Sequence, residues 1–398
     1  MTSSNDRLQN WTPDAEGPEF LGLNLEALRG LANFADVSEG FTLAVAEVNL
    51  ATDADLLIQA LKARPECEQV QFEVLDFAGV QVKSLLDELV AKLPLLPAAA
   101  EPKQVLTVRG LETSIGAVHD NPPFLQDLNF IRDALARQVA YPLILVLPKY
   151  AVKRMARFAR DFWAWASLVL EFRSVQHSVE TLRTETLTPG RLFSSDPKPA
   201  KEGRIQQLHQ LLEEYAPTAQ QTDSANADIR LDILQELGNA YLSLADVGRA
   251  ERCFRQMLEL SQISEQRLRQ ANALLRLGTA VGISKTKTTA LEIFEDALAT
   301  YREVGDRLGE ASTLQGLGSL QDADKGLKAF LAAQEIYQAI GDRYSQGRNL
   351  VLFIGPAYLA LKHLDDAKVV FQSAAEIGQA IGFEPLTQYA LEQLSHCE

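Results

Sequence analysis

Residues 234–258 read LQELGNAYLSLADVGRAERCFRQML and contain no run that alternates like a strand. The apolar residues recur at the spacing of a helix, on both sides of a short polar stretch around Asp246. Gly238 and Ala250 are small, and Phe254 follows Ala250 by one helical turn. Small residues let two antiparallel helices approach closely, and a large ring can fill the remaining gap. The stretch therefore predicts a pair of packed helices.

The same pattern recurs three more times in the second half of the chain. The matching segments are LLRLGTAVGISKTKTTALEIFEDAL (274–298), LQGLGSLQDADKGLKAFLAA (314–333) and LFIGPAYLALKHLDDAKVVFQSAA (352–375). The anchoring glycines are spaced by 40, 40 and 37 residues and are Gly238, Gly278, Gly318 and Gly355. One helix pair cannot bury its apolar face alone, so the pairs must stack. We expect a right-handed helical solenoid.

The pattern L-G-x-x-Y…A-x3-F-x2-A resembles the tetratricopeptide repeat (TPR). The inter-repeat segments YREVGDRLGEAST (301–313) and YQAIGDRYSQGRN (337–349) are similar to a forty-residue variety of that repeat. Repeat three departs from the pattern, because its inter-helix turn is about four residues short and Gln321 replaces the usual tyrosine. We expect tighter or irregular packing there. Helices over 204–216 and 385–397 are expected to flank the array.

The first half has a different organisation. Short apolar runs alternate with helical patterns, and the runs are FTLAVAEVN, VQFEVLDF, KQVLTVRG, PLILVLP and SLVLEFR. Runs that are apolar at nearly every position indicate strands covered on both faces. We therefore expect an α/β domain with a mostly parallel, five-stranded, P-loop-like sheet, followed by an all-α TPR solenoid.

These patterns give predicted domain boundaries. The stretch after the fifth run is rich in Ser, Thr and Pro and has no sustained period, which is typical of a linker. The predicted parts are a flexible N-terminal segment (1–24), the α/β domain (25–175), a linker (176–203) and a repeat domain with four repeats and flanking helices (204–398).

The first half also resembles a known family. The residues that carry the likeness are VLTVRGLE (105–112), where a Walker B strand would be, LNFIRDALARQVAYPLILVLPKYAVKRMARFARDFWAW (128–165) and EFRS (171–174). They resemble the degenerate AAA or STAND-type ATPase-like domain that precedes tetratricopeptide repeats in many bacterial, notably cyanobacterial, proteins. The resemblance implies the shape of a nucleotide-binding domain.

The residues that would bind a nucleotide do not follow the family pattern. A P-loop reads G-x-x-x-x-G-K-[ST], because glycines let backbone N–H groups approach the phosphates and the lysine neutralises them. Here the turn after the first strand is NLATD (49–53), and the Walker B equivalent ends in Glu112 rather than in an Asp on the strand. We expect a pseudo-ATPase without a cofactor. The alternative is a regulatory NTPase that binds ATP and Mg²⁺ through Asn49, Thr52 and Glu112.

Composition excludes several other classes. The formal net charge of −15 disfavours broad contact with nucleic acid or anionic lipid. Three distant cysteines give no disulfide framework, five scattered histidines give no metal-ligand spacing, and no G-x-S-x-G occurs. With no signal peptide and no long apolar stretch, we expect a cytoplasmic protein that is not inserted in a membrane and holds no metal.

Four basic residues cluster in an otherwise apolar segment. Lys149, Lys153, Arg157 and Arg160 would share one face of a helix at i,i+4 and i,i+3 spacing. One reading is a solvated outer face. The other is an electrostatic contact with the acidic repeats or with an acidic partner.

The inner face of the solenoid is the predicted binding surface, through positions two, five and nine of each first helix and two neighbouring arginines. The candidates are Gln235, Asn239, Asn272, Arg276, Thr279, Ser312, Gln315, Arg348 and Asn349. They do not form the Lys and Arg clamp that binds a C-terminal carboxylate. We expect a non-enzymatic adaptor that binds a protein partner, and self-assembly of the α/β half into a homo-oligomer stays open.

Overall fold

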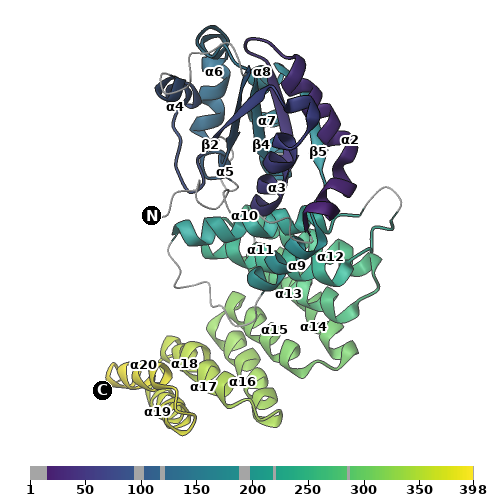
Figure 1. Ribbon diagram of the computed structural model, residues 1–398. Helices are drawn as coiled ribbons and strands as arrows, with labels where there is room; N and C mark the ends of the chain where they lie inside the picture. Colours follow the sequence, from purple (N-terminus) through teal and green to yellow (C-terminus); the bar gives the residue numbers. More distant parts are fainter. Residues whose placement is uncertain are drawn as a thin grey trace. The chain divides into compact units, whose positions relative to one another are not determined.

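The computed structural model describes residues 16–93, 103–116, 122–187, 198–217, 221–284 and 287–397 of this chain. The chain divides into two compact units, Met1–Ala216 and Pro217–Glu398. Figure 1 shows the elements of each.

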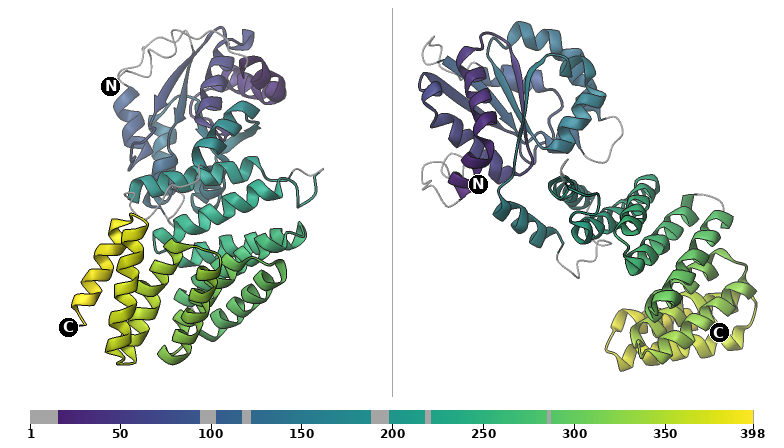
Figure 2. Two further views of the ribbon diagram at one scale, coloured as in Figure 1. Left: turned by 90° about the horizontal axis from the view of Figure 1, so that it is seen from below. Right: turned by 90° about the vertical axis from the view of Figure 1, so that its right-hand side faces the viewer.

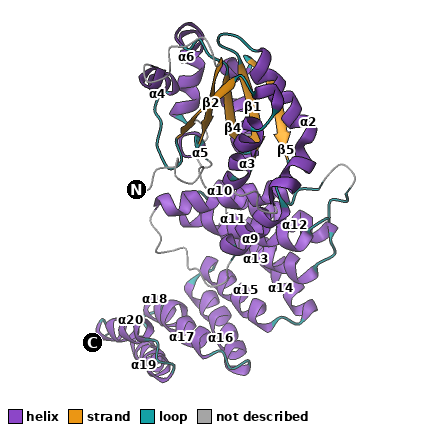
Figure 3. Cartoon of the chain, in the orientation of Figure 1, coloured by secondary structure: helices purple, strands orange, loops and turns teal. Residues whose placement is uncertain are grey.

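A parallel five-stranded sheet forms the centre of the first unit. Its strands are β1 (Leu43–Val48), β2 (Val70–Asp76), β3 (Lys103–Arg109), β4 (Leu143–Leu147) and β5 (Ala166–Phe172), in the order β2-β3-β4-β1-β5. Strand β1 pairs in parallel with β4 on one side and with β5 on the other. The strands, orange in Figure 3, confirm the five apolar runs.

Helices cover both faces of this sheet (Figure 2). One face packs against α2 (Glu16–Val37) and α3 (Ala51–Lys62). The other packs against α4 (Leu85–Lys92), α6 (Pro123–Gln138), α7 (Lys149–Phe158) and α8 (Arg160–Trp163). The central strands are therefore apolar on both sides, which is why they lack polar alternation. Two short helices, η1 (Pro65–Cys67) and α5 (Glu112–Ile115), complete the connections between strands.

Residues 16–24, which were expected to be flexible, form the first part of α2. Phe20 is buried and its ring stacks on Phe172 of β5, with ring centroids 6.3 Å apart. Asn24 interrupts the helical backbone, and its side chain exchanges two hydrogen bonds with the backbone of Arg173. These contacts with the end of β5 fix the segment. The remaining part of the predicted flexible segment, 1–15, lies outside the described residues.

The predicted linker contains a helix, α9 (Gln176–Thr186). Its residues Val179 and Thr186 are buried, so this part of 176–203 is packed. The following helix, α10 (Lys198–Glu214), was assigned to the repeats from residue 204 onward. It packs against α7 and α9 within the first unit. The predicted domain boundaries remain a proposal, and residues 188–197 lie outside the described part.

The second unit is built from helix pairs, and its described residues contain no strand. The first three pairs are α11 (Ala227–Ser243) with α12 (Val247–Ile263), α13 (Arg267–Ser284) with α14 (Lys287–Val304), and α15 (Arg307–Leu320) with α16 (Ala323–Ala339). In the fourth, α17 (Arg343–Asn349), η4 (Leu350–Ile354) and α18 (Gly355–Ala360) together pair with α19 (Leu364–Ala380). Helix α20 (Glu384–Ser395) packs on α19, as expected.

The anchoring glycines lie directly under the aromatic ring of their own repeat. A Cβ atom on Gly238 would lie 2.3 Å from the ring of Phe254. The corresponding distances in the other repeats are 2.9, 2.5 and 2.3 Å, for Gly278 to Phe294, Gly318 to Phe330 and Gly355 to Phe371. The absence of a side chain on these glycines is therefore what allows the two helices of a repeat to meet.

Repeat three, where tighter or irregular packing was expected, has a short first helix and a close approach of two glycines. Helix α15 has 14 residues, whereas α13 has 18. A second glycine, Gly326, faces Gly318, and a Cβ on Gly326 would lie 2.7 Å from the Gly318 carbonyl oxygen. The backbones of α15 and α16 are thus nearly in contact.

Repeat four contains one extra residue. The first helices of repeats three and four begin at Arg307 and Arg343, a step of 36, whereas Gly318 and Gly355 are 37 apart. The extra residue is absorbed by η4, a π-helical turn that ends just before Gly355. Pro356 follows, and proline cannot donate a helical hydrogen bond. A π turn is a known way to accommodate such an insertion.

Candidate functional site at the carboxyl ends of the strands

The ends of β1 and β4 mark the place where an open parallel sheet binds ligands. The two strands are neighbours, but the helices that follow them, α3 and α7, lie on opposite faces of the sheet. The crevice outside the carboxyl ends of such strands is the usual ligand site of doubly wound folds. Asn49 follows β1 and Lys149 begins α7, so these residues define the site in this chain.

The connection after β1 is too short to form a phosphate cradle. Strand β1 ends at Val48 and α3 begins at Ala51, so only Asn49 and Leu50 lie between them. Leu50 is extended, with φ −111° and ψ 143°. A cradle needs several successive backbone N–H groups that converge on one anion. The missing glycines and lysine thus coincide with a missing loop.

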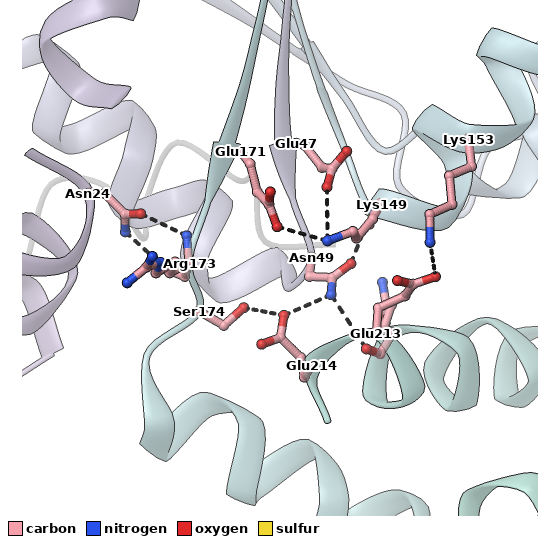
Figure 4. Close-up of polar contacts among 11 residues, drawn as sticks. Asn24, Glu47, Asn49, Lys149, Lys153, Glu171, Arg173, Ser174, Glu213 and Glu214 are labelled. Carbon is pink, nitrogen blue, oxygen red and sulfur yellow. Dashed lines mark hydrogen bonds and ion pairs between the residues drawn. The ribbon is translucent and has the colours of Figure 1, made fainter. Parts of the chain in front are cut away.

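The side chain of Asn49 is fully used within the protein. Asn49 is 7% exposed, and its Oδ1 accepts a hydrogen bond of 3.1 Å from the backbone N–H of Lys149. Its Nδ2 donates to Glu214 Oε1 at 2.7 Å and to the carbonyl oxygen of Gln210 at 3.4 Å. Figure 4 shows these contacts. Asn49 therefore joins β1, the first turn of α7 and the last turns of α10.

Helix α10 lies across the strand ends. Ser174, just after β5, donates from Oγ to Glu214 Oε1 at 2.7 Å. Gln206 donates from Nε2 to the backbone carbonyl of Glu112 at 3.2 Å. Gln206, Gln210 and Glu214 follow at i, i+4 and i+8, so they share one face of α10 over about 12 Å. The carboxylate of Glu214 thus accepts from two donors at the ligand crevice.

Two lysines at this site form ion pairs with acidic side chains of other elements. Glu213 and Glu214 lie in the last turn of α10, where the helix dipole disfavours negative charge, and Lys149 lies in the first turn of α7, where it disfavours positive charge. Lys153 Nζ lies 2.5 Å from Glu213 Oε1, and Lys149 Nζ lies 2.8 Å from Glu171 Oε1. Each unfavourable helix end therefore finds its counter-charge on another element.

Glu47 and Lys149 also affect each other's pKa. Their charged atoms are 3.8 Å apart. Burial raises the pKa of Glu47, and the nearby Lys149 only partly opposes this. For Lys149, partial burial lowers the pKa, but the hydrogen bond to Glu171 and the surrounding carboxylates raise it overall. Lys149 therefore stays protonated and held by the chain's own acids.

Glu112 occupies the first position of α5, beyond β3. It is half-buried, and burial raises the pKa of its carboxyl. Arg109, at the end of β3, is held by ion pairs with Asp55 and with Asp76, the latter at 2.8 Å. The arginine that could neutralise Glu112 is thus already paired with two other carboxylates.

The three residues of the alternative nucleotide site have different surroundings. Asn49 and Glu112 contact α10 at different points, through Glu214 and Gln206. Thr52 lies exposed in the first turn of α3. Asn49 is therefore covered by α10, while Thr52 faces solvent.

The predicted basic stripe is shorter than expected. Helix α7 ends at Phe158, because Ala159 has non-helical angles of φ −113° and ψ 49°. Arg160 therefore belongs to α8, and its placement on the same helix face as Lys149, Lys153 and Arg157 was wrong. The Arg157 guanidinium lies 5.0 Å from the centre of the Phe158 ring. Arg160 Nε donates to the carbonyl oxygen of Arg157 at 3.2 Å.

The predicted inner-face residues differ in their accessibility. Arg276, Thr279 and Arg348 are exposed. Five others are half-buried, namely Gln235, Asn239, Asn272, Ser312 and Gln315. Asn272 Oδ1 accepts from the Tyr301 hydroxyl at 2.6 Å, and Gln315 Oε1 accepts from the Tyr337 hydroxyl at 3.0 Å. The amide side chains of Asn272 and Gln315 therefore contribute to the packing of their own repeats.

The prediction for Asn349 was wrong. Its exposure is 0%, and its Nδ2 donates to the Phe330 carbonyl oxygen at 2.8 Å and to Gln334 Oε1 at 2.9 Å. The cause is the extra residue in η4. The predicted position was set by its distance from Gly355, and the π turn between them shifts that position by one residue along the chain. Arg348 is the residue equivalent to Ser312, and Asn349 is equivalent to the buried Thr313.

The sequence reading missed the residues of α10 and β5 that complete the strand-end site. They are Ser174, Gln206, Glu213 and Glu214. One signal was present in LLEEYA at 211–216, where two carboxylates end a helix against its dipole. Such a pair needs basic partners elsewhere, and the basic stripe supplies one of them through Lys153.

Within the described ranges, no three His, Cys, Asp or Glu side chains gather as a metal site would require. In that same part of the chain, no helix combines the length and the apolar character needed to cross a bilayer.

Comparison with known proteins gives fold-level likeness only. No family model matches the chain, and no curated protein matches it. Among solved structures, BtubC from P. vanneervenii is 16% identical with a TM-score of 0.42, over 52% of this chain and 80% of that one. A Signal Transduction ATPase with Numerous Domains that has a tetratricopeptide repeat sensor, from Pyrococcus horikoshii, is 10% identical with a TM-score of 0.38, over 94% and 85%. These values are too low to support a functional argument.

Proposed function

We propose that this protein is a non-catalytic adaptor that binds another protein through its helical repeats, and that its α/β unit is a pseudo-NTPase. The observation that carries the second part is the hydrogen bond of 2.7 Å from Asn49 to Glu214 of α10. A nucleotide phosphate at this crevice would meet a carboxylate instead of a row of backbone N–H groups. The negative charges of Glu214 and of a phosphate would repel each other, so α10 suits this place better than a nucleotide does.

The adaptor part rests on the inner face of the repeats. Stacked helix pairs present an extended surface that suits a polypeptide ligand. On the first helices, Arg276, Thr279, Ser319 and Leu352 are exposed, giving a mixed polar and apolar surface. Such mixed composition is typical of transient protein interfaces.

The adaptor proposal is tested by affinity capture with the full chain. Thr279→Arg puts a bulky charge on the inner face, and Ala299→Arg puts the same charge on an exposed position of α14, a second helix. We expect one set of proteins to be captured by the wild type and by Ala299→Arg, with at least a tenfold loss for Thr279→Arg. Equal capture by all three proteins, or capture by none, would contradict the proposal.

A further inference from the structure

The first helix of repeat four exposes a row of residues that combines one arginine with aromatic and apolar side chains. Tyr344 is 44% exposed and Leu352 is 41% exposed, and Arg348 and Pro356 are also exposed. They follow one another at intervals of four, so they share one face of the helix formed by α17, η4 and α18. At the position of Arg348, repeats two and three carry the half-buried Asn272 and Ser312.

Arg348 sits at the edge of an aromatic pair. Its guanidinium carbon lies 5.6 Å from the centre of the Tyr344 ring, within range of a cation–π interaction. The Tyr344 ring meets the ring of Phe383 edge-on, with centroids 5.4 Å apart and planes at 73°. Phe383 is 38% exposed. The Tyr344 ring therefore contacts the arginine, and Phe383 supports that ring from its edge while both rings stay partly exposed.

The inward partner found in the neighbouring repeats is missing in repeat four. In repeats two and three a tyrosine of the second helix, Tyr301 or Tyr337, reaches the polar residues of the first helix. These tyrosines come four residues before the left-handed glycines Gly305 and Gly341. The residue four before the next such glycine, Gly382, is Gly378, which has no side chain. The second helix of repeat four therefore offers Arg348 no tyrosine hydroxyl at the position equivalent to Tyr301 and Tyr337.

Arg348 also has no carboxylate partner in the part of the second unit that the structure describes. Most arginines of that unit do form ion pairs, and these are Arg249, Arg255, Arg267, Arg269, Arg302 and Arg307. The chain as a whole has a net charge of −15. An exposed guanidinium left without an acid in so acidic a protein suits a carboxylate supplied from outside.

We infer that Tyr344, Arg348, Leu352 and Phe383 form the anchor point for a partner segment that carries an Asp or Glu next to a large apolar side chain. This inference rests on the proposed adaptor function and specifies its partner. The carboxylate would accept two parallel hydrogen bonds from Arg348, and the apolar side chain would cover Tyr344 and Leu352. The π turn η4, which begins two residues after Arg348 and contains Leu352, fits this role, since such insertions are frequent at functional sites.

The inference is tested with a phage-displayed library of random peptides selected on the full chain. We expect selected peptides to contain Asp or Glu near Leu, Ile, Phe or Trp. A synthetic copy should bind at least tenfold more weakly to Arg348→Ala and to Tyr344→Ala, measured by fluorescence anisotropy. Arg348→Lys should bind with intermediate affinity, because lysine keeps the charge but not the paired donors. Arg252→Ala, which removes an exposed arginine from α12, is the matched control and should bind normally.

The outcomes separate this inference from the adaptor proposal. Selected peptides without acidic residues, or equal binding to Arg348→Ala and wild type, would overturn the anchor point. If Thr279→Arg abolishes peptide binding while Arg348→Ala does not, the adaptor stands and the anchor lies elsewhere on the inner face. If no peptide is selected and no protein is captured, both proposals fail. Because Arg348 is exposed, its variants should keep the wild-type thermal unfolding curve, which verifies that a loss of binding is local.

Discussion

At the scale of single residues, Asn49 joins several elements of the first unit through one short side chain. It accepts from the N–H of Lys149 and donates to Glu214, so it links the first turn of α7 to the last turn of α10. A buried polar group of this kind is costly to remove, because its partners lose hydrogen bonds that water cannot restore.

We expect Asn49→Asp to lower the free energy of unfolding of the first unit by about 2–3 kcal/mol. The substitution removes the donor to Glu214 and puts a second carboxylate beside it. All three tryptophans lie within the first 165 residues, so tryptophan fluorescence in a urea titration reports this unit. The double variant Asn49→Asp, Glu214→Gln should recover part of the loss. A single variant as stable as the wild type would contradict this account of Asn49.

Glu112 gives a prediction with a defined dependence on pH. Burial raises the pKa of its carboxyl above the ordinary value of about 4.3, so the folded state binds the proton more tightly than the unfolded chain. Its contribution to stability is therefore present at low pH and is lost as the pH rises through the raised pKa. We expect Glu112→Gln to be at least as stable as the wild type at about pH 7.5, with the difference shrinking towards about pH 4. A variant that is less stable at neutral pH would mean that the charged form is favoured.

At the scale of elements, the helix pairs depend on the contact between each glycine and its ring. Gly238→Ala would put a methyl group 2.3 Å from the Phe254 ring, inside its van der Waals surface. We expect the second unit to lose about 1–3 kcal/mol, the usual cost of overpacking. Gly248→Ala, in the first turn of α12, is the control, since a Cβ there meets nothing within 4 Å. Thermal unfolding followed by circular dichroism should show the loss only for Gly238→Ala, and equal midpoints would refute the packing argument.

The sequence predicted those elements whose signal is local. The central strands β1 and β4 are apolar along their length because helices cover both faces, whereas the edge strand β5 alternates in exposure. The repeats recur because each must fit the next. The position of α10 could not be predicted in this way. Its partners Asn49, Lys153 and Ser174 are between 40 and 165 residues away in sequence, and no local period encodes such pairings.

The errors in the predicted site also have physical causes. Asn349 was misplaced because a π turn adds a residue that alignment on the glycines hides. Arg160 was misplaced because Ala159 breaks the helix without any Pro or Gly to mark the break. The first part of α2 was missed because Phe20 packs on β5, a contact between the two ends of the first unit's fold. Each case depends on tertiary contacts or backbone geometry that residue spacing alone does not reveal.

At the scale of the whole molecule, the chain consists of two units with different features. In the first, Glu213 and Glu214 of the chain's own α10 contact Lys153 and Asn49 beside the carboxyl ends of the strands. In the second, the first helices of the stacked pairs expose both polar and apolar side chains. The molecule is then expected to act by binding another protein and not by nucleotide chemistry.

Isothermal titration of the full chain with ATP and Mg²⁺ tests the central claim most directly. The account predicts no saturable heat at ATP concentrations up to about 1 mM, near the upper end of common substrate affinities. Saturable micromolar binding by the wild type that is lost in Glu112→Gln would contradict it and would favour a regulatory NTPase.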